Sequence, residues 1–127
     1  MNPFHHVDLR VRNFEEVQVF YRAFLPLLGF TQEWAGKEFR GFSAEDDAPD
    51  CAFFGFTEDS NHQPNGNRIA FWARSRELVD RVGTAVRAAG AKNIEGPGVC
   101  PEYSADYYAI FFEDPNGNKL EVVHRSS

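Results

Sequence analysis

Several side chains in this 127-residue sequence are of types that bind metal ions or anions. His6 and Glu121 can ligate a divalent cation, because imidazole nitrogen and carboxylate oxygen both donate electron pairs to such ions. Arg68 cannot ligate a metal, since its guanidinium keeps its proton in proteins, but it can hold a carboxylate, phosphate or phenolate by paired hydrogen bonds. The sequence therefore offers two kinds of chemistry, and the elements that carry these residues decide which of them meet.

Two segments of alternating polarity carry the first of these residues. Residues 4–12 alternate polar and apolar side chains, which predicts a half-buried strand with His6 on the polar face. Residues 68–73 alternate in the same way and place Arg68 opposite the apolar face. The further side chains predicted to share these two faces are Asp8 with His6, and Trp72 with Arg68.

Each of these strands is followed by the pattern of a capped helix. Asn13 and Ser75 stand as N-caps, and Gly29 and Gly90 end the apolar stripes that follow them. The offset between the two copies is constant within one residue. This spacing predicts an internal duplication of a strand followed by a helix.

Each predicted helix is followed by material for three strands. The expected strands are 30–34, 38–42 and 51–56 in the first half, and 93–95, 107–113 and 119–124 in the second. Asp-Pro-Asn-Gly-Asn at 114–118 is a strong hairpin signal. We therefore predict one α+β domain over 1–127, made of two βαβββ modules, module one over 1–60 and module two over 65–127. A half of about 60 residues is marginal alone, so the halves are expected to fold together or to pair with a second chain.

Composition excludes several classes of partner. The 13 Lys+Arg and 19 Asp+Glu give a net charge of −6, and the arginines are scattered, which argues against nucleic-acid binding. We expect no membrane association and a cytoplasmic location, because the sequence has neither a long apolar run nor a signal-peptide pattern. Cys51 and Cys100 are expected to be reduced thiols. The 13 phenylalanines predict an aromatic core and, on sheet strands, an aromatic pocket wall.

The paired modules, the His-Val that opens the first strand and the closing segment 112–124, FEDPNGNKLEVVH, resemble the vicinal oxygen chelate superfamily. This superfamily includes glyoxalase I, bleomycin-resistance proteins, fosfomycin-resistance enzymes and extradiol dioxygenases. The resemblance covers essentially the whole chain. It implies curled mixed sheets around a central cavity, helices on the outer face, and a homodimer.

The resemblance also implies a metal site, but this chain matches only some of the ligand positions of the family. His6 matches the first ligand of the family, and Glu121 matches the carboxylate ligand, which can also act as a catalytic proton acceptor. The implied ion is one divalent Fe, Mn, Ni or Zn. Arg68 stands where metal-dependent relatives often have a ligand histidine. His62 or His5 would have to replace that ligand, and neither is expected to point inward.

Two functions remain open at this point. The preferred one is metal-free binding of a small planar or anionic organic ligand, with four residues in contact with it: Asp8, Arg68, Trp72 and Tyr108. The alternative is a metal-dependent lyase, transferase or dioxygenase that uses His6, Glu121 and a third ligand.

Each of the four proposed contacts has a structural alternative, which for Trp72 is packing on the sheet and for the tyrosine is packing as an aromatic with an exposed hydroxyl. Arg68 can instead form an internal ion pair with Glu121 or Asp8, and Asp8 can instead pair with Arg10. Tyr107 and Tyr108 are neighbours on a strand, so one of them must face the cavity.

Overall fold

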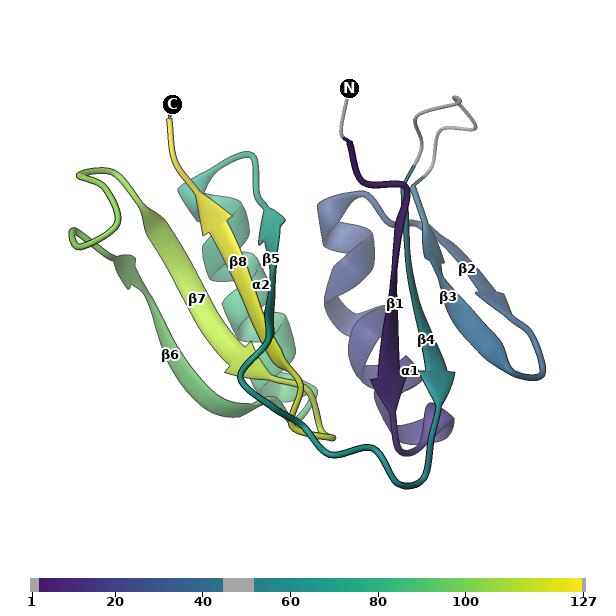
Figure 1. Ribbon diagram of the computed structural model, residues 1–127. Helices are drawn as coiled ribbons and strands as arrows, with labels where there is room; N and C mark the ends of the chain where they lie inside the picture. Colours follow the sequence, from purple (N-terminus) through teal and green to yellow (C-terminus); the bar gives the residue numbers. More distant parts are fainter. Residues whose placement is uncertain (1–2, 45–51, 127) are drawn as a thin grey trace. The chain divides into compact units, whose positions relative to one another are not determined.

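The computed structural model describes residues 3–44 and 52–126, and the chain divides into two compact units, Met1–Gln63 and Pro64–Ser127. The elements of the first unit are β1 (His6–Val11), α1 (Phe14–Phe24), the 3₁₀ helix η1 (Leu25–Leu28), β2 (Gln32–Ala35), β3 (Phe39–Ser43) and β4 (Phe53–Glu58) (Figure 1). Those of the second are β5 (Arg68–Trp72), α2 (Arg76–Ala88), β6 (Lys92–Val99), β7 (Tyr108–Glu113) and β8 (Lys119–His124). The prediction of two βαβββ modules is confirmed.

Each unit builds a four-stranded mixed sheet with the same topology. The strand order is β1-β4-β3-β2 in the first unit and β5-β8-β7-β6 in the second. The first strand of each unit runs parallel to its last strand, and the remaining pairs are antiparallel. The duplication seen in the sequence is therefore a duplication of topology.

The helix caps lie where the residue types predict them. Oδ1 of Asn13 accepts a hydrogen bond from the backbone N–H of Glu16 at 3.1 Å, and Oγ of Ser75 accepts one from the N–H of Leu78 at 3.1 Å. Each bond satisfies an N–H that has no partner within its helix. Gly29 follows η1 with a φ of 101°, a left-handed conformation that glycine adopts without steric cost.

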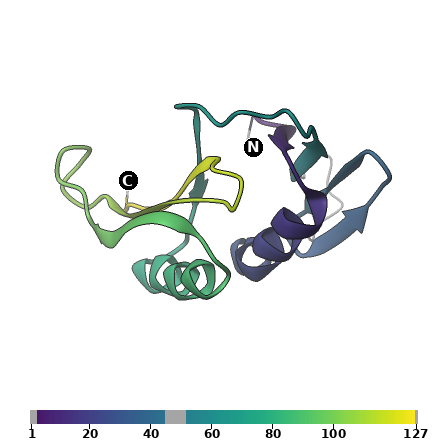
Figure 2. The ribbon, with the colours of Figure 1, turned by 90° about the horizontal axis from the view of Figure 1, so that it is seen from below.

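The helix of each unit covers one face of its own sheet (Figure 2). In the first unit the buried ring of Tyr21 lies 5.1 Å from that of Phe54 and 5.4 Å from that of Phe56. In the second unit the buried apolar side chains that face the helix come from β5, α2, β7 and β8: Phe71, Leu78, Val79, Val82, Val86, Ile110, Phe112, Leu120 and Val122. Strand residues of the opposite parity point to the other face of each sheet.

Most strand boundaries lie within two residues of the predicted ones, and the largest difference is at the end of β6. β6 continues through Gly96–Gly98, where the sequence predicted a break, and its pairing with β7 shifts register twice. Pro97 lies within the second of these shifts, on an edge strand, which is where a sheet tolerates a residue without a backbone N–H. β4 begins at Phe53, and Cys51 lies outside the described residues.

No helix among the described residues has both the length and the apolar character that crossing a membrane requires.

Candidate functional site

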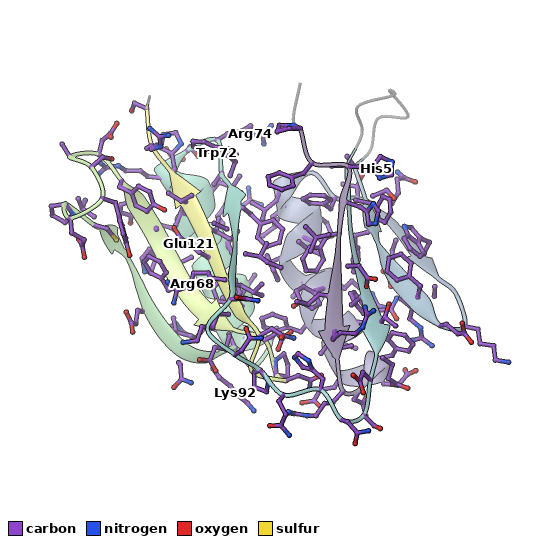
Figure 3. All side chains as sticks on the ribbon, viewed as in Figure 1. His5, Arg68, Trp72, Arg74, Lys92 and Glu121 are labelled. Carbon is purple, nitrogen blue, oxygen red and sulfur yellow. The ribbon has the colours of Figure 1, made fainter. Side chains whose placement is uncertain are left out.

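The face of the second sheet that is turned away from α2 carries the main candidate residues. Arg68 comes from β5, Phe111 from β7 and Glu121 from β8, each at a position whose parity is opposite to that of the buried core. In the sheet register Glu121 lies between Ala70 and Phe111. Figure 3 shows Arg68 and Glu121 on these adjacent strands. The duplicated strands thus bring together residues that are far apart in the sequence.

Arg68 does not use Glu121 as a partner. The centre of its guanidinium lies 4.9 Å from the ring centroid of Phe111, which is the geometry of a cation–π contact. Among the described residues, the ion pairs within 4.0 Å do not include Arg68. The ion pair of Arg68 with Glu121 or Asp8 that the sequence allowed is therefore absent. Arg68 is the register partner of Lys119 on β8, and its guanidinium extends past β8 to Phe111 on β7.

Glu121 is a buried acid, 6% exposed, and its hydrogen-bond partner is Tyr107. The hydroxyl of Tyr107 donates to Oε2 of Glu121. The pKa of Tyr107 is raised well above its ordinary value, first because burial disfavours the phenolate and next because Glu121 favours the protonated hydroxyl. Tyr107 and Glu121 thus form a hydrogen-bonded pair on the face of the sheet that is turned away from α2.

Tyr108, the predicted ligand contact, lies on the other side of the sheet. Its hydroxyl donates to Oδ1 of Asp80 on α2 at 2.6 Å, and the guanidinium of Arg76 lies 4.9 Å from its ring centroid. The bond to Asp80 is the main reason that the pKa of Tyr108 is raised. The tyrosine on the face of Glu121 is thus Tyr107. Strand alternation predicted that one of the two would face this side, without deciding which.

A pocket of about 280 Å³ opens on this face of the second unit. Its lining combines charged, aromatic and very small side chains: Arg68, Glu95, Gly96, Gly98, Val99, Cys100, Glu102, Tyr103, Ala109 and Phe111. The pKa of the Cys100 thiol is raised, first by burial and then by the negative charges of Glu102 and Glu121. The negative charge of Glu121 therefore acts on Cys100, a residue that lines the pocket.

Trp72 shares the strand parity of Arg68, as predicted, and is 64% exposed. The guanidinium of Arg125 lies 5.5 Å from its ring centroid. Trp72 is not among the residues that line the pocket.

The first unit places His6 and Asp8 on the open face of its own sheet. The ring of His6 stacks on that of Phe53, with centroids 4.5 Å apart and planes at 1°. Nδ1 of His6 lies 2.7 Å from Nδ1 of His5, so the neighbouring imidazole points toward it rather than away.

Asp8 forms local contacts within the first sheet. It accepts hydrogen bonds from Arg10 at 2.9 Å and from Oγ1 of Thr57 at 3.0 Å. The carboxylate of Asp8 is thus occupied by the charge pair that was considered from the sequence.

Neither unit by itself brings together the metal ligands that the resemblance implies. Over residues 3–44 and 52–126, no three His, Cys, Asp or Glu side chains come together in a group able to hold a metal ion. Glu121 contacts Tyr107, and His6 contacts His5 and Phe53. Nδ1 of His124 lies 2.9 Å from the carbonyl oxygen of Ala73, a contact between strand ends.

Comparison with known proteins agrees with the duplicated fold. A crystal structure of a glyoxalase/bleomycin resistance protein from Albidiferax ferrireducens is 30% identical, with a TM-score of 0.78 over 98% of this chain and 100% of that one. A glyoxalase/bleomycin resistance protein/dioxygenase family enzyme from Burkholderia phytofirmans is 22% identical, with a TM-score of 0.71 over 94% and 95% of the two chains. No curated protein sequence gives a significant match.

A more distant similarity is to the fosfomycin resistance protein FosX from Listeria monocytogenes, whose structure is a complex with Mn(II) and sulfate. It is 18% identical, with a TM-score of 0.69 over 99% of this chain and 92% of that one, and shows the shared fold alone. The sequence profile of the Glyoxalase/Bleomycin resistance protein/Dioxygenase superfamily matches residues 4–122. With two βαβββ modules and this match over nearly its whole length, the chain belongs to that superfamily.

Proposed function

We propose that this protein binds a small, planar organic ligand through an anionic group, in the pocket of the second unit, with Arg68 as the anion-binding residue. The observation that carries the proposal is the state of Arg68. Its guanidinium lines the pocket, is oriented over Phe111, and has no acidic partner within 4.0 Å among the described residues.

The chemistry of Arg68 suits this role. A guanidinium is planar and always charged, and it presents paired N–H donors that match a carboxylate, phenolate or phosphate. Stacking over Phe111 holds the head group in one orientation before a ligand arrives, which reduces the entropy lost on binding.

The lining of the pocket leaves open space at Gly98. Gly98 is paired with Ala109, and a Cβ atom built on Gly98 would meet nothing within 4 Å. The volume of about 280 Å³ is near the lower end of small-molecule sites, which is about 300 Å³. A ligand with a single ring is therefore the expected size.

The alternative function, a divalent-metal-dependent lyase, transferase or dioxygenase, gives Glu121 the roles of metal ligand and proton acceptor. Oε2 of Glu121 instead accepts a hydrogen bond from the hydroxyl of Tyr107, and Arg68, which cannot ligate a metal, lines the pocket. These contacts support the metal-free binding function over the metal-dependent one.

Replacing Arg68 tests the anion-binding role. In Arg68→Gln, the dissociation constant for benzoate is expected to rise about tenfold, the effect of one lost charge-assisted hydrogen bond. Arg81→Gln, which removes an exposed arginine of α2 outside the pocket, should leave benzoate binding unchanged. Titration followed by NMR chemical shifts measures both constants. Equal affinities in the two variants would refute the proposal.

A second pair of variants tests the pocket itself. The valine side chain in Gly98→Val should occupy the open space of the pocket and abolish benzoate binding. Gly66→Val, outside the pocket, should leave binding unchanged. A Cβ at either glycine would meet nothing within 4 Å, and neither residue has a positive φ, so both variants are expected to fold. Thermal unfolding checks that both variants are folded before binding is compared. Undiminished binding in Gly98→Val would place the ligand elsewhere.

A further inference from the structure

Three charged side chains line the pocket of the second unit without pairing with one another. They are Arg68, Glu95 and Glu102. Among the described residues, none of the three forms an ion pair within 4.0 Å. Their charges are therefore available to a ligand.

Opposite charges elsewhere in the chain do pair. Arg22 donates two hydrogen bonds to the carboxylate of Glu33, at 2.8 and 2.7 Å. Arg40 lies 3.4 Å from Glu15. Arg68 differs from these two arginines in that its guanidinium contacts an aromatic ring, that of Phe111, rather than a carboxylate.

The two carboxylates of the pocket come from different points along the chain: Glu95 is the register partner of Phe111, whereas Glu102 lies beyond the end of β6. Arg68 lies over Phe111, whereas Glu102 follows Cys100 and raises the pKa of its thiol. The N–H of Cys100 donates to the carbonyl of Tyr107, four residues before Phe111 on the same chain segment. Four residues of extended chain span about 13 Å, so the segment that leads to Glu102 meets the chain well away from Phe111, the ring over which Arg68 lies.

A ligand with only negative charge leaves Glu102 without a partner and brings its own charge toward two carboxylates. A ligand with an anionic group at one end and a protonated amine at the other satisfies both ends of the pocket. We propose that the pocket selects dipolar, single-ring compounds, with the anionic group on Arg68 and the ammonium group on Glu102. This inference rests on the proposed function and specifies its ligand class.

Three probes of the same ring and shape test the selection: para-aminomethylbenzoate, para-methylbenzoate and para-methylbenzylamine. The first is a zwitterion near neutral pH, and the others carry only its negative or only its positive charge. Calorimetric titration is expected to show that the zwitterion binds about tenfold more tightly than para-methylbenzoate, the effect of one additional charge-assisted hydrogen bond.

Variants then assign the preference to Glu102. In Glu102→Gln the zwitterion and para-methylbenzoate should bind equally, since the amine loses its charged acceptor. Glu77→Gln, an exposed acid of α2 outside the pocket, is the matched control and should keep the tenfold preference. A preference that survives in Glu102→Gln, or that is absent from the unmodified protein, overturns the inference.

Arg68→Gln separates the two proposals. If it weakens para-methylbenzoate while the Glu102 variant changes nothing, anion binding stands and dipolar selection fails. If none of the probes binds at millimolar concentration, or if Arg68→Gln changes no affinity, the proposed function fails and the inference falls with it.

Discussion

At the scale of single residues, the candidate site of the second unit is defined by the contacts of two charged side chains, Arg68 and Glu121. Arg68 lies over an aromatic ring rather than against an acid, and Glu121 accepts a hydrogen bond from Tyr107 rather than from an arginine. A buried carboxylate needs a donor to offset its lost hydration, and the tyrosine hydroxyl supplies one. Glu121 is thus satisfied without a cation.

The raised pKa of Tyr107 leads to a testable pH dependence. Titration of phenolate absorbance should contain two ionisations above the ordinary tyrosine value of 10.0, from Tyr107 and Tyr108, and the higher of the two should be missing in Tyr107→Phe. In Glu121→Gln the pKa of Tyr107 should fall but stay above 10.0, because burial, the largest cause, remains. Asp80→Asn, which acts on Tyr108, should not move this step.

The same shift affects stability with a definite sign. The pKa of Tyr107 is higher in the folded than in the unfolded chain, so its contribution is fully present below pH 10.0 and is lost as the pH rises through the folded value. Denaturant unfolding of the wild type should therefore lose stability faster than that of Tyr107→Phe above pH 10.0. Parallel pH profiles for the two proteins would contradict this assignment.

At the scale of elements, the close approach of β3 and β4 depends on a missing side chain. A Cβ atom on Gly41 would lie 2.5 Å from the carbonyl oxygen of Phe54 and 2.9 Å from Cα of Gly55. Both are backbone atoms of the paired strand, which cannot move aside as a side chain can. The first sheet therefore needs glycine at this position.

Gly41→Ala is expected to lower the free energy of unfolding by ~1–3 kcal/mol, the usual cost of overpacking. The control is Gly66→Ala, where a Cβ meets nothing within 4 Å and the change should stay within ~1 kcal/mol. Urea denaturation measures both values. Equal stability of the two variants would show that β4 can yield at this point.

At the scale of the whole molecule, the chain is two copies of one topology that carry different chemistry. The first unit holds His6 against an aromatic ring, and the second holds Arg68, Glu121 and the pocket. The duplication preserves the strands and helices while the residues on the open faces have diverged. His6 and Glu121 belong to different units, so metal binding by both has to be measured on the full chain.

Protein purified without chelators is expected to contain far less than one equivalent of Fe, Mn, Ni or Zn by elemental analysis. The reason is that Arg68 replaces a ligand expected from the family, and a smaller donor set lowers metal affinity. Stoichiometric metal that disappears in Glu121→Gln would instead support the metal-dependent alternative. Arg68→His is the converse variant and should increase the metal content.

The elements of this protein could be predicted from the sequence because their signals are local. Alternation marked the strands, Asn13 and Ser75 marked the starts of both helices, and the constant offset revealed the duplication. The end of β6 was missed, because tolerance of Pro97 depends on the strand being at a sheet edge.

Side-chain partners were decided only by the tertiary structure. Alternation showed that Tyr107 and Tyr108 face opposite ways, but the face that each occupies depends on the register of β7. Parity placed Arg68 and Glu121 on one face, but their pairing depends on how far each side chain reaches across the strands. The sequence by itself thus determined the order of strands and helices along the chain and the chemical types at the site, because these follow from periodicity. Only the packed sheet decided which of those groups are paired and which remain available to a ligand.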